Sequence, residues 1–330
     1  PARDEHATAV LDELARMECH AELFDLADFP RGARLSLAYG AGGAARFTLR
    51  YTDGREVDLT ACRAAWWRRP LPFEMGDDIT GPGEHAFAYT ECHEAITGLW
   101  HALDARWVND PAWNDVAAKK THQLRAAAEV GLRVPETLVT NDPGDARAFA
   151  ERVGAGRTIY KSFLATEEYW RETRLLRPEE LALLDHLAVA PVIFQEFVPA
   201  AVDLRITIVG DRIFPAAIHS QETGYPVDFR MELETVRIEP ATLPASVEEA
   251  LHRLMARLGI SYGAVDMRRT PAGEHVFLEV NPAGEWLFVE RRTEQPITRA
   301  LAELLAALDR PGTGERTAPP FSRTQGRRAP

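Results

Sequence analysis

Alternating hydrophobic and polar residues predict β-strands along most of the chain. Side chains two apart on a strand share a face, so alternation over several residues is typical of a strand with one buried face. The expected strands cover residues 34–39, 45–51, 57–59, 64–67, 134–140, 158–163, 192–198, 203–209 and 212–218. Thr52-Asp53-Gly54 and Gly210-Asp211 lie between consecutive strands and have turn chemistry, so each is expected to close a hairpin.

Apolar residues spaced three and four apart predict helices between these strands. The expected helices cover residues 8–17, 86–103, 116–130, 145–152, 178–187, 246–258 and 296–308. Gly131, Gly154 and Gly259 each follow one of these segments, where glycine is the usual residue after a helix end. Ser246-Val-Glu-Glu249 has capping-box spacing and Gly81-Pro82-Gly83 has loop composition. This mixture of strands and helices is typical of an α/β (α+β) fold.

One predicted hairpin gathers three oxygen ligands. Glu279 and Asn281 are two apart on a strand and therefore share a face. The turn at Thr270–Gly273 folds the strand that carries Asp266 back beside them, and counting from this turn places Asp266 opposite Glu279. Two carboxylates and an amide oxygen, with waters and phosphates completing the shell, suit Mg²⁺ held on a nucleotide. A solvated hairpin face explains the same spacing.

Composition excludes several classes of protein. The 330 residues, 45% hydrophobic and 27% charged, are ordinary for a globular chain of two or three subdomains. No apolar run approaches the ~20 residues of a membrane span, and the first residues do not resemble a signal peptide, so we expect a cytoplasmic protein without membrane contact. The net charge of −12 argues against nucleic-acid binding. Cys19, Cys62 and Cys92 lack metal-site spacing and suit free thiols.

Two lysines and a polar strand end are candidate nucleotide contacts. Lys120 on a predicted helix and Lys161 inside an apolar strand could each reach a phosphate, where ammonium groups act as point charges. The alternative is that Lys161 lies on a solvated outer face. The strand that ends in Gln195-Glu196 suits a hinge whose backbone binds an adenine edge while Glu196 binds a ribose hydroxyl or an amine. A strand leaving the core explains this pattern too.

Two further charged groups have open interpretations. Asp203 and Arg205 share a strand face, and Arg205 could bind a transferred phosphoryl group through its forked guanidinium. A surface contact between strands is the alternative. Arg171, Arg174 and Arg177 form a basic group that suits either a solvated surface or an acidic peptide.

The order of these residues resembles that of ATP-grasp carboxylate ligases, from about residue 107 to residue 308. The closer resemblance is to the graspetide (microviridin-type) peptide ligases, and five motifs carry it: Trp66-Trp67-Arg68-Arg69-Pro70, Lys120-Thr-His-Gln-Leu124, Ser220-Gln221, Asp228-Phe229-Arg230 and Asn281-Pro-Ala-Gly-Glu-Trp286. It implies an ATP-grasp fold with an N-terminal pre-ATP-grasp domain. The expected domains are 1–105 (pre-ATP-grasp), 106–190 (central subdomain) and 191–310 (C-terminal subdomain). Residues 311–330, rich in Pro, Gly, Thr and Arg, predict a disordered tail.

The resemblance also implies roles for individual residues, with ATP and Mg²⁺ as cofactors. The implied roles are phosphate binding by Lys120 and Lys161; adenine binding by Gln195, Glu196, Phe197 and Val198; a place near the ribose for Asp203; contact with the reacting phosphate for Arg205 and with the acceptor carboxylate for Arg230; and Mg²⁺ ligation by Asp266, Glu279 and Asn281. This chain departs from the family pattern at three places. Lys119-Lys120 replaces Asn-Lys, which leaves the first lysine open between the two. Ala283-Gly-Glu-Trp286 replaces Asn-Gly-Gln-Trp, and no glycine-rich loop follows Lys161.

The implied activity is ADP-forming macrocyclisation of a ribosomal precursor peptide with a leader and an acidic core. Asp or Glu side chains of the peptide become acyl phosphates, and a hydroxyl or amine of the same peptide captures them as a macrolactone or macrolactam. A homodimer is expected. The alternatives are a RimK-type ligase acting on a free α-carboxylate and a non-catalytic nucleotide- or peptide-binding scaffold, which would not need an intact ligand set. A Rossmann enzyme is excluded because no GxGxxG follows a first strand.

Overall fold

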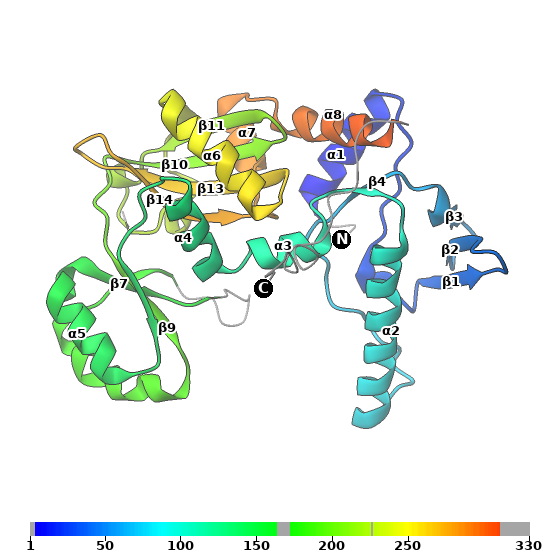
Figure 1. Ribbon diagram of the computed structural model, residues 1–330, viewed down its shortest axis with the longest axis horizontal. Coiled ribbons are helices and arrows are strands. Elements are labelled where there is room, and N and C mark those ends of the chain that lie inside the picture. The colour runs from blue at the N-terminus through cyan, green and yellow to red at the C-terminus, as the bar shows by residue number, and fades with distance from the viewer. Residues whose placement is uncertain (1–3, 164–171, 226, 311–330) are drawn as a thin grey trace, which may run out of the picture. The chain divides into compact units, whose positions relative to one another are not determined.

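The computed structural model describes residues 4–163, 172–225 and 227–310, and Figure 1 labels their helices and strands. The predicted tail at 311–330 and Arg171 of the basic group lie outside the described residues. The chain folds into two compact units. The first contains the residues up to Asp115, Ile260–Tyr262 and the described residues from Pro296 onward, and the second contains Val116–Gly259 and Gly263–Gln295.

The first unit has two small sheets. In one, β1 (Ala33–Tyr39) pairs antiparallel with β2 (Ala45–Tyr51), which pairs antiparallel with β3 (Glu56–Asp58). In the other, β4 (Ala64–Trp66) runs parallel to β5 (Arg106–Val108). The helices of this unit are α1 (Glu5–Arg16), α2 (Pro82–Ala102) and α8 (Ile297–Asp309), with 3₁₀ turns η1 (Leu26–Asp28) and η2 (Leu59–Ala61). α8 packs against α1 and β4, so the C-terminal helix completes the N-terminal core.

A four-stranded antiparallel sheet forms one part of the second unit. Its order is β6 (Thr137–Thr140), β9 (Val192–Glu196), β7 (Thr158–Lys161) and β8 (Arg174–Leu175). The helix α5 (Pro143–Val153) and the 3₁₀ segment η4 (Pro178–Val189) cover it, and η3 (Ala155–Arg157) precedes β7. Phe149, Leu184 and Phe194 join the two helical segments to the sheet in one buried cluster.

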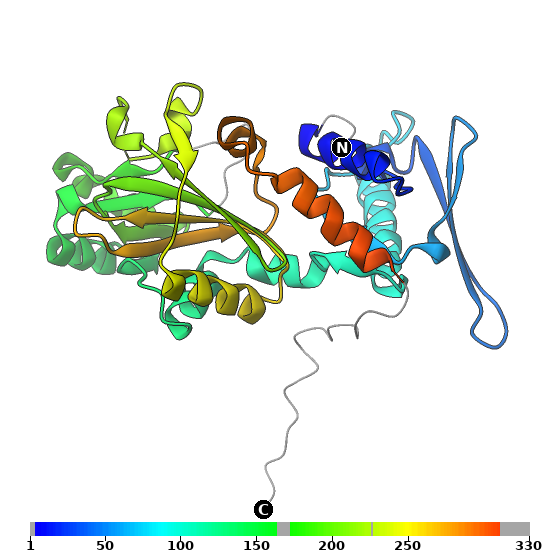
Figure 2. The same ribbon diagram turned by 90° about the horizontal axis from the view of Figure 1, so that it is seen from above.

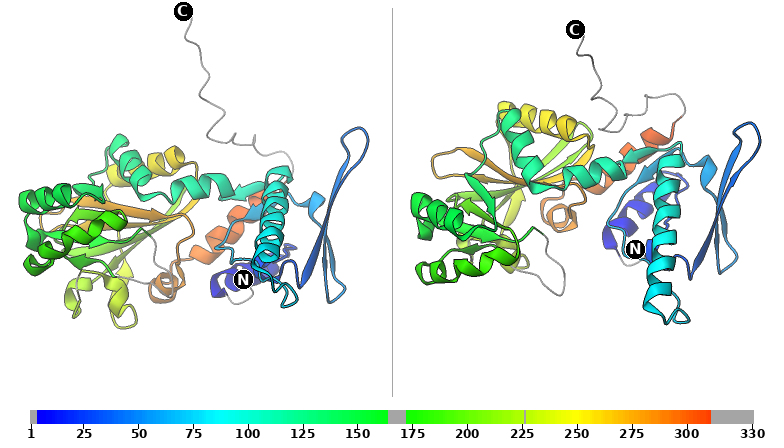
Figure 3. Two further views of the ribbon diagram at one scale, coloured as in Figure 1. Left: turned by 90° about the horizontal axis from the view of Figure 1, so that it is seen from below. Right: turned by 60° about the horizontal axis from the view of Figure 1, so that its bottom comes forward.

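A five-stranded sheet forms the other part of the second unit. Its order is β12 (Ile238–Pro240), β11 (Arg212–Ile218), β10 (Val202–Val209), β13 (Tyr262–Arg269) and β14 (His275–Asn281). The remaining elements of this unit are α4 (Lys120–Glu129), α6 (Ala245–Leu258), α7 (Leu287–Thr293), η5 (Ser220–Glu222) and η6 (Phe229–Glu232), whereas α3 (Pro111–Ala117) begins in the first unit and ends in the second. α4 and α6 pack side by side, and α4 lies along the edge strand β14 (Figures 2 and 3). Every residue of the central strand β10 is buried.

Most of the predicted elements are confirmed, together with the α/β (α+β) class, but three details are wrong. The single helix expected at 116–130 is divided into α3 and α4 by extended backbone at Lys119. α6 begins after Pro244 without a side-chain cap, so Ser246 does not cap it. Pro82 is the first residue of α2 and not part of a loop, as suits proline, which has no N–H to satisfy there.

The predicted domain boundaries at 105/106 and 190/191 remain proposals. β9, which follows the second boundary, hydrogen-bonds to β6 and β7, which precede it. Among the described residues, none of the helices combines the length and the apolar character that a membrane crossing requires.

Candidate active site

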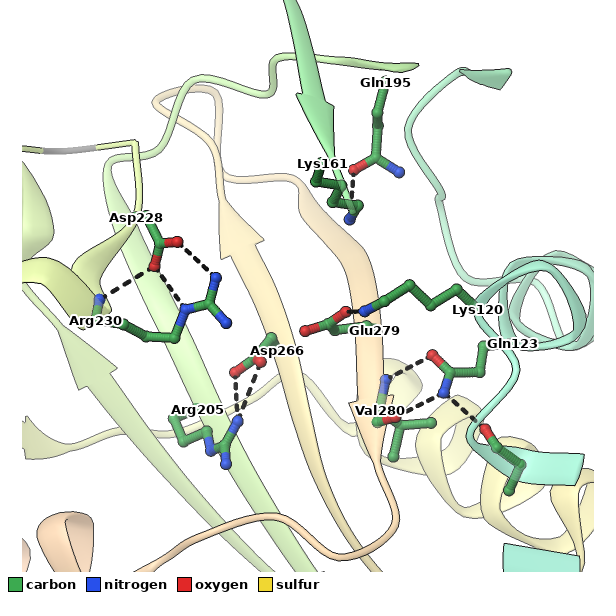
Figure 4. A network of polar contacts seen from close by, with 11 residues as sticks. Lys120, Gln123, Lys161, Gln195, Arg205, Asp228, Arg230, Asp266, Glu279 and Val280 are labelled. Carbon is green, nitrogen blue, oxygen red and sulfur yellow. Dashed lines mark hydrogen bonds and ion pairs between the residues drawn. The ribbon is translucent and has the colours of Figure 1, made fainter. Parts of the chain in front are cut away.

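The β13–β14 hairpin places Asp266 directly opposite Glu279, which confirms the predicted register. Two residues along, Ala264 pairs with Asn281, so Asp266, Glu279 and Asn281 lie on one face of the sheet. The register shifts after Asp266, because Met267 pairs with Phe277 and leaves Leu278 as the extra residue of a β-bulge. Figure 4 shows the two carboxylates approaching one another from neighbouring strands.

Arg205 on β10 binds the Asp266 carboxylate. Its Nη1 donates to both Asp266 oxygens at 3.0 Å, and its Nη2 donates to the main-chain oxygen of Glu285 at 2.9 Å. Only 8% of Arg205 is exposed, so it is not the surface contact that the sequence left open. Burial raises the pKa of Asp266, the Arg205 charge opposes that rise, and the Glu279 charge adds to it.

Lys120 on α4 forms an ion pair with Glu279. Burial favours the neutral acid, but the charges of Lys120 and Lys161 outweigh it and hold the pKa of Glu279 at about 2. Lys161 donates to Gln195 Oε1 at 3.1 Å, and burial lowers the pKa of its ammonium group. The site therefore places the charges of two lysines beside one ionised carboxylate. This excess of positive charge is what an anion-binding site requires.

A pocket joins the two sheets of the second unit. It is lined by Lys120, Thr121, Leu124, Thr137, Val139, Lys161, Ile193, Gln195 and Leu278. Four of these residues are aliphatic, three are neutral and polar, and the two lysines contribute the charge. A flat apolar ring that carries anionic groups would match this lining. Lys120, and not Lys119, lines the pocket and reaches Glu279, so the geometry supports Lys120 as the first lysine.

The candidate adenine hinge follows β9. The Phe197 N–H donates to the main-chain oxygen of Arg157 at 2.7 Å, and the Val198 oxygen accepts from Arg268 at 2.8 Å. Glu196 Oε2 accepts a long hydrogen bond of 3.4 Å from the main-chain N–H of Glu136. These groups already have protein partners, and the adenine roles assigned to Gln195, Glu196, Phe197 and Val198 stay predictions.

Arg268 is a site residue that the sequence reasoning missed. Its Nε donates to Asp203 Oδ1 at 2.7 Å, its Nη1 to the Val198 oxygen, and its Nη2 to the Val227 oxygen at 2.9 Å. Ser220 donates to the other Asp203 oxygen. Asp203 is 3% exposed with both oxygens bound, so this geometry does not favour its predicted ribose contact, which stays untested. The signal in the sequence was Arg268 itself, a charge two residues after Asp266 on a buried strand.

Arg230 lies in η6 and pairs with the carboxylate that caps this turn. Its Nε and Nη2 donate to the two Asp228 oxygens at 2.7 and 2.5 Å. Burial opposes ionisation of Asp228, but Arg230 lowers its pKa. Arg230 also acts electrostatically on Asp266 and Glu279, which places its charge beside the paired carboxylates (Figure 4).

The donor set of the hairpin fits Mg²⁺. Asp266 and Glu279 supply hard carboxylate oxygens, and the Asn281 amide oxygen accepts one hydrogen bond, of 3.0 Å from the Ala283 N–H, which leaves a second lone pair. In the described part of the chain, no three His, Cys, Asp or Glu side chains come together as a metal site. A cation held here would therefore need phosphate or water oxygens as well, as Mg²⁺ on a nucleotide has.

Solved structures resemble this chain over nearly its whole length. The macrocyclase MdnC of Microcystis aeruginosa, bound with the precursor peptide MdnA, is 32% identical with a TM-score of 0.82 and covers 92% of this chain and 97% of its own. MdnB of the same organism is 29% identical with a TM-score of 0.76, and the match covers 91% of this chain and 94% of MdnB. A RiPP-associated ATP-grasp ligase of Chryseobacterium gregarium is 24% identical with a TM-score of 0.83, and the match covers 92% of this chain and 94% of the ligase. At this identity the similarity is one of fold. No protein-family model matches the chain, and no curated protein matches it.

A pocket between two sheets, lined by two lysines and closed by a carboxylate hairpin, together with these likenesses defines an ATP-grasp ligase. The chain belongs to the graspetide-type ATP-grasp ligases, the family of the macrocyclases MdnC and MdnB. The predicted family, fold and ligase activity are confirmed, and neither the α-carboxylate ligase nor the scaffold is favoured.

Proposed function

We propose that this enzyme closes rings in a ribosomal precursor peptide, using ATP and Mg²⁺. It joins Asp or Glu side chains of the peptide core to Ser or Thr hydroxyls or Lys amines of the same core. The observation that carries the proposal is the convergence of Lys120, Lys161 and Arg205 on the Asp266–Glu279 pair. Support also comes from MdnC, bound with its precursor peptide, and from a related ligase in complex with ADP and a leader and core peptide.

The first step activates a peptide carboxylate. Its oxygen attacks the γ-phosphorus of ATP, the bond to ADP breaks, and an acyl phosphate forms. Lys120 and Lys161 hold phosphate oxygens, and Arg205 stabilises charge on the transferred group. Asp266, Glu279 and Asn281 would hold Mg²⁺, which when bound would supply positive charge beside the phosphates. Arg230, whose side chain is about half exposed, orients the acceptor carboxylate through its guanidinium.

The second step captures the acyl phosphate. A hydroxyl or amine of the peptide adds to the acyl carbon, phosphate leaves, and the nucleophile loses its proton, so an ester or amide closes the ring. Positioning dominates this chemistry, and no covalent intermediate on the protein is required.

The test is intact mass spectrometry of peptides incubated with the enzyme, ATP and Mg²⁺. The substrates are MdnA and the short acidic peptides encoded beside the gene. We expect the loss of one water per ring bond, dependent on ATP, matched by ADP release and absent with Asp266→Asn. If no peptide changes mass while free amino acids or a peptide C-terminus stimulate ATP hydrolysis, the proposal is wrong and the α-carboxylate ligase replaces it.

The resemblance supports two further proposals. We propose that the enzyme acts as a homodimer, which light scattering of the purified protein tests, and that it works in the cytoplasm, where ATP and newly made peptide are both present. A monomer at working concentration would contradict the first. Secretion of the protein by its host would contradict the second.

A further inference from the structure

Gln123 is a buried amide whose partners surround the hairpin. It lies on α4, three residues after Lys120, and only 2% of it is exposed. Its Nε2 donates to the main-chain oxygens of Ala117 at 2.6 Å and Val280 at 2.7 Å. Its Oε1 accepts from the Val280 N–H at 3.1 Å. The amide therefore uses both donors and its acceptor within the protein (Figure 4).

The two hydrogen bonds between Gln123 and Val280 take the place of pairing with a further strand. β14 is an edge strand, and among the described residues its outer side pairs with the main chain only through a bridge between Val276 and Arg133, so Val280 has no neighbouring strand to pair with there. Gln123 binds both the N–H and the C=O of Val280, as the backbone of a sixth strand would. A carboxylate of the same shape lacks the donors, and an apolar side chain would leave three buried main-chain groups unpaired.

Val280 lies between Glu279 and Asn281, the two candidate Mg²⁺ ligands on β14. Residues three apart on a helix share a face, so Lys120 and Gln123 reach the strand together. Lys120 binds Glu279, and Gln123 binds the next residue. α4 thus holds two consecutive residues of β14, one through an ion pair and one through an amide clamp.

We propose that Gln123 is a positioning residue that fixes the main chain between two metal ligands and so sets the place of Glu279 against Lys120. The proposal rests on the proposed Mg-ATP function. Residues that hold a metal ligand in place contribute to metal affinity without touching the metal. Gln123 acts in this way, through Val280.

Asn109 offers a matched control within the same chain. Its Nδ2 donates to the Tyr262 oxygen at 2.9 Å, and its Oδ1 accepts from the N–H groups of Tyr262 at 2.9 Å and Ser261 at 2.8 Å. It is likewise 2% exposed. This clamp binds the same pair of main-chain groups on one residue, but neither neighbour of Tyr262 is a candidate ligand.

The test compares Gln123→Met with Asn109→Leu by calorimetric titration of ADP, with and without Mg²⁺. Both variants lose a buried amide clamp and should lose stability to a similar degree. We expect Gln123→Met to weaken the Mg²⁺-dependent gain in ADP affinity by about 10–100-fold, the usual effect of removing a partner that holds a metal ligand. ADP affinity without Mg²⁺ should stay close to the wild-type value, and Asn109→Leu should leave both affinities unchanged. An equal Mg²⁺ response in the two variants would overturn the proposal.

A second variant keeps the proposal testable if Gln123→Met does not fold. Gln123→Asn retains the amide but is one methylene too short for both Val280 groups, so a folded Gln123→Asn protein should show a reduced Mg²⁺ gain. A wild-type gain in that variant overturns the role of Gln123 alone. If Mg²⁺ does not raise ADP affinity in the wild-type enzyme, both the positioning role and the proposed use of Mg-ATP fail.

Discussion

Arg205 is the residue that joins a proposed metal ligand to the segment after Asn281. Its guanidinium binds Asp266 on one side and the Glu285 oxygen on the other. We expect Arg205→Ala to bind ADP measurably but to lose on the order of 10²–10³-fold in kcat, because a preorganised donor to the reacting phosphate is removed. ADP release in the presence of peptide measures kcat, and calorimetry measures ADP binding. Unchanged turnover would exclude this role, and Arg212→Ala, at an exposed position on β11, serves as the control.

Gly284 is required by close approach. A Cβ added there would lie 2.4 Å from the Ala264 Cβ and 3.0 Å from Arg205 Nη2. Ala264 is fully buried and cannot turn away, so we expect Gly284→Ala to lower the free energy of unfolding by about 1–3 kcal/mol and to displace Arg205.

Chemical denaturation and turnover measure these two effects of Gly284→Ala. The control is Gly98→Ala on α2, where an added Cβ meets nothing within 4 Å. That substitution should be neutral or should stabilise by up to ~1 kcal/mol, because alanine is the better helix former. Equal effects of the two substitutions would show that the clash at Gly284 is relieved by small shifts.

At the scale of elements, two ion pairs of opposite polarity bridge β10 and β13. Arg205 on β10 meets Asp266 on β13, and Asp203 on β10 meets Arg268 on β13. Arg268 also binds the main chain at Val198 after β9 and at Val227 before η6. One guanidinium therefore connects the candidate hinge, the central strand and the segment that carries Arg230.

Loss of Arg268 would leave the buried Asp203 charge without its partner. We expect Arg268→Met to lower the free energy of unfolding by about 3–5 kcal/mol, measured by urea denaturation. The double variant Arg268→Met/Asp203→Leu should recover part of the loss, because it buries no unpaired charge. A cost below ~1 kcal/mol for the single variant would mean that water or another cation compensates Asp203.

The division between α3 and α4 shows where element prediction fails. The helical pattern is continuous across residues 116–130, so the pattern alone predicts one helix. In the fold, the Ala117 oxygen at the end of α3 accepts from the Gln123 side chain, and the backbone at Lys119 is extended. The break between α3 and α4 is thus stabilised by the Gln123 side chain, which is itself held in place by its contact with Val280 on β14.

At the scale of the whole molecule, acid stability depends on carboxylates with lowered pKa values, of which Asp4 is one. Its Oδ1 accepts from the first N–H groups of α1, and its Oδ2 accepts from Arg68 at 2.9 Å. Burial raises the pKa of Asp4, but Arg68 and the cap lower it below the ordinary value of 3.8. Because the pKa of Asp4 is lower in the folded than in the unfolded protein, Asp4 contributes fully to the free energy of unfolding above its ordinary pKa. This contribution is lost as the pH falls through the pKa of the folded state.

Asp4→Asn isolates the charge, because Asn caps helices as well as Asp does. We expect the variant to have a free energy of unfolding about 1–3 kcal/mol lower than wild type at pH 7, since it loses a hydrogen bond between charged groups. The difference between the two proteins should shrink as the pH falls through the lowered pKa of Asp4, because the wild-type carboxyl then becomes protonated and loses its charge. Thermal unfolding across this range checks the prediction, and a constant difference at all pH values would contradict it.

The sequence by itself determined the hairpin and the family. Turn residues and strand alternation are local, so the register of Asp266 against Glu279 follows from counting, and the order of the motifs carries the resemblance. Only the tertiary structure decided the partners of the buried polar groups. Gln123 meets Val280 across 157 positions of sequence, and Arg268 meets Asp203 across 65. Buried donors and charges must have partners in the folded protein, and these partners come from distant parts of the chain. A local sequence pattern therefore does not predict them.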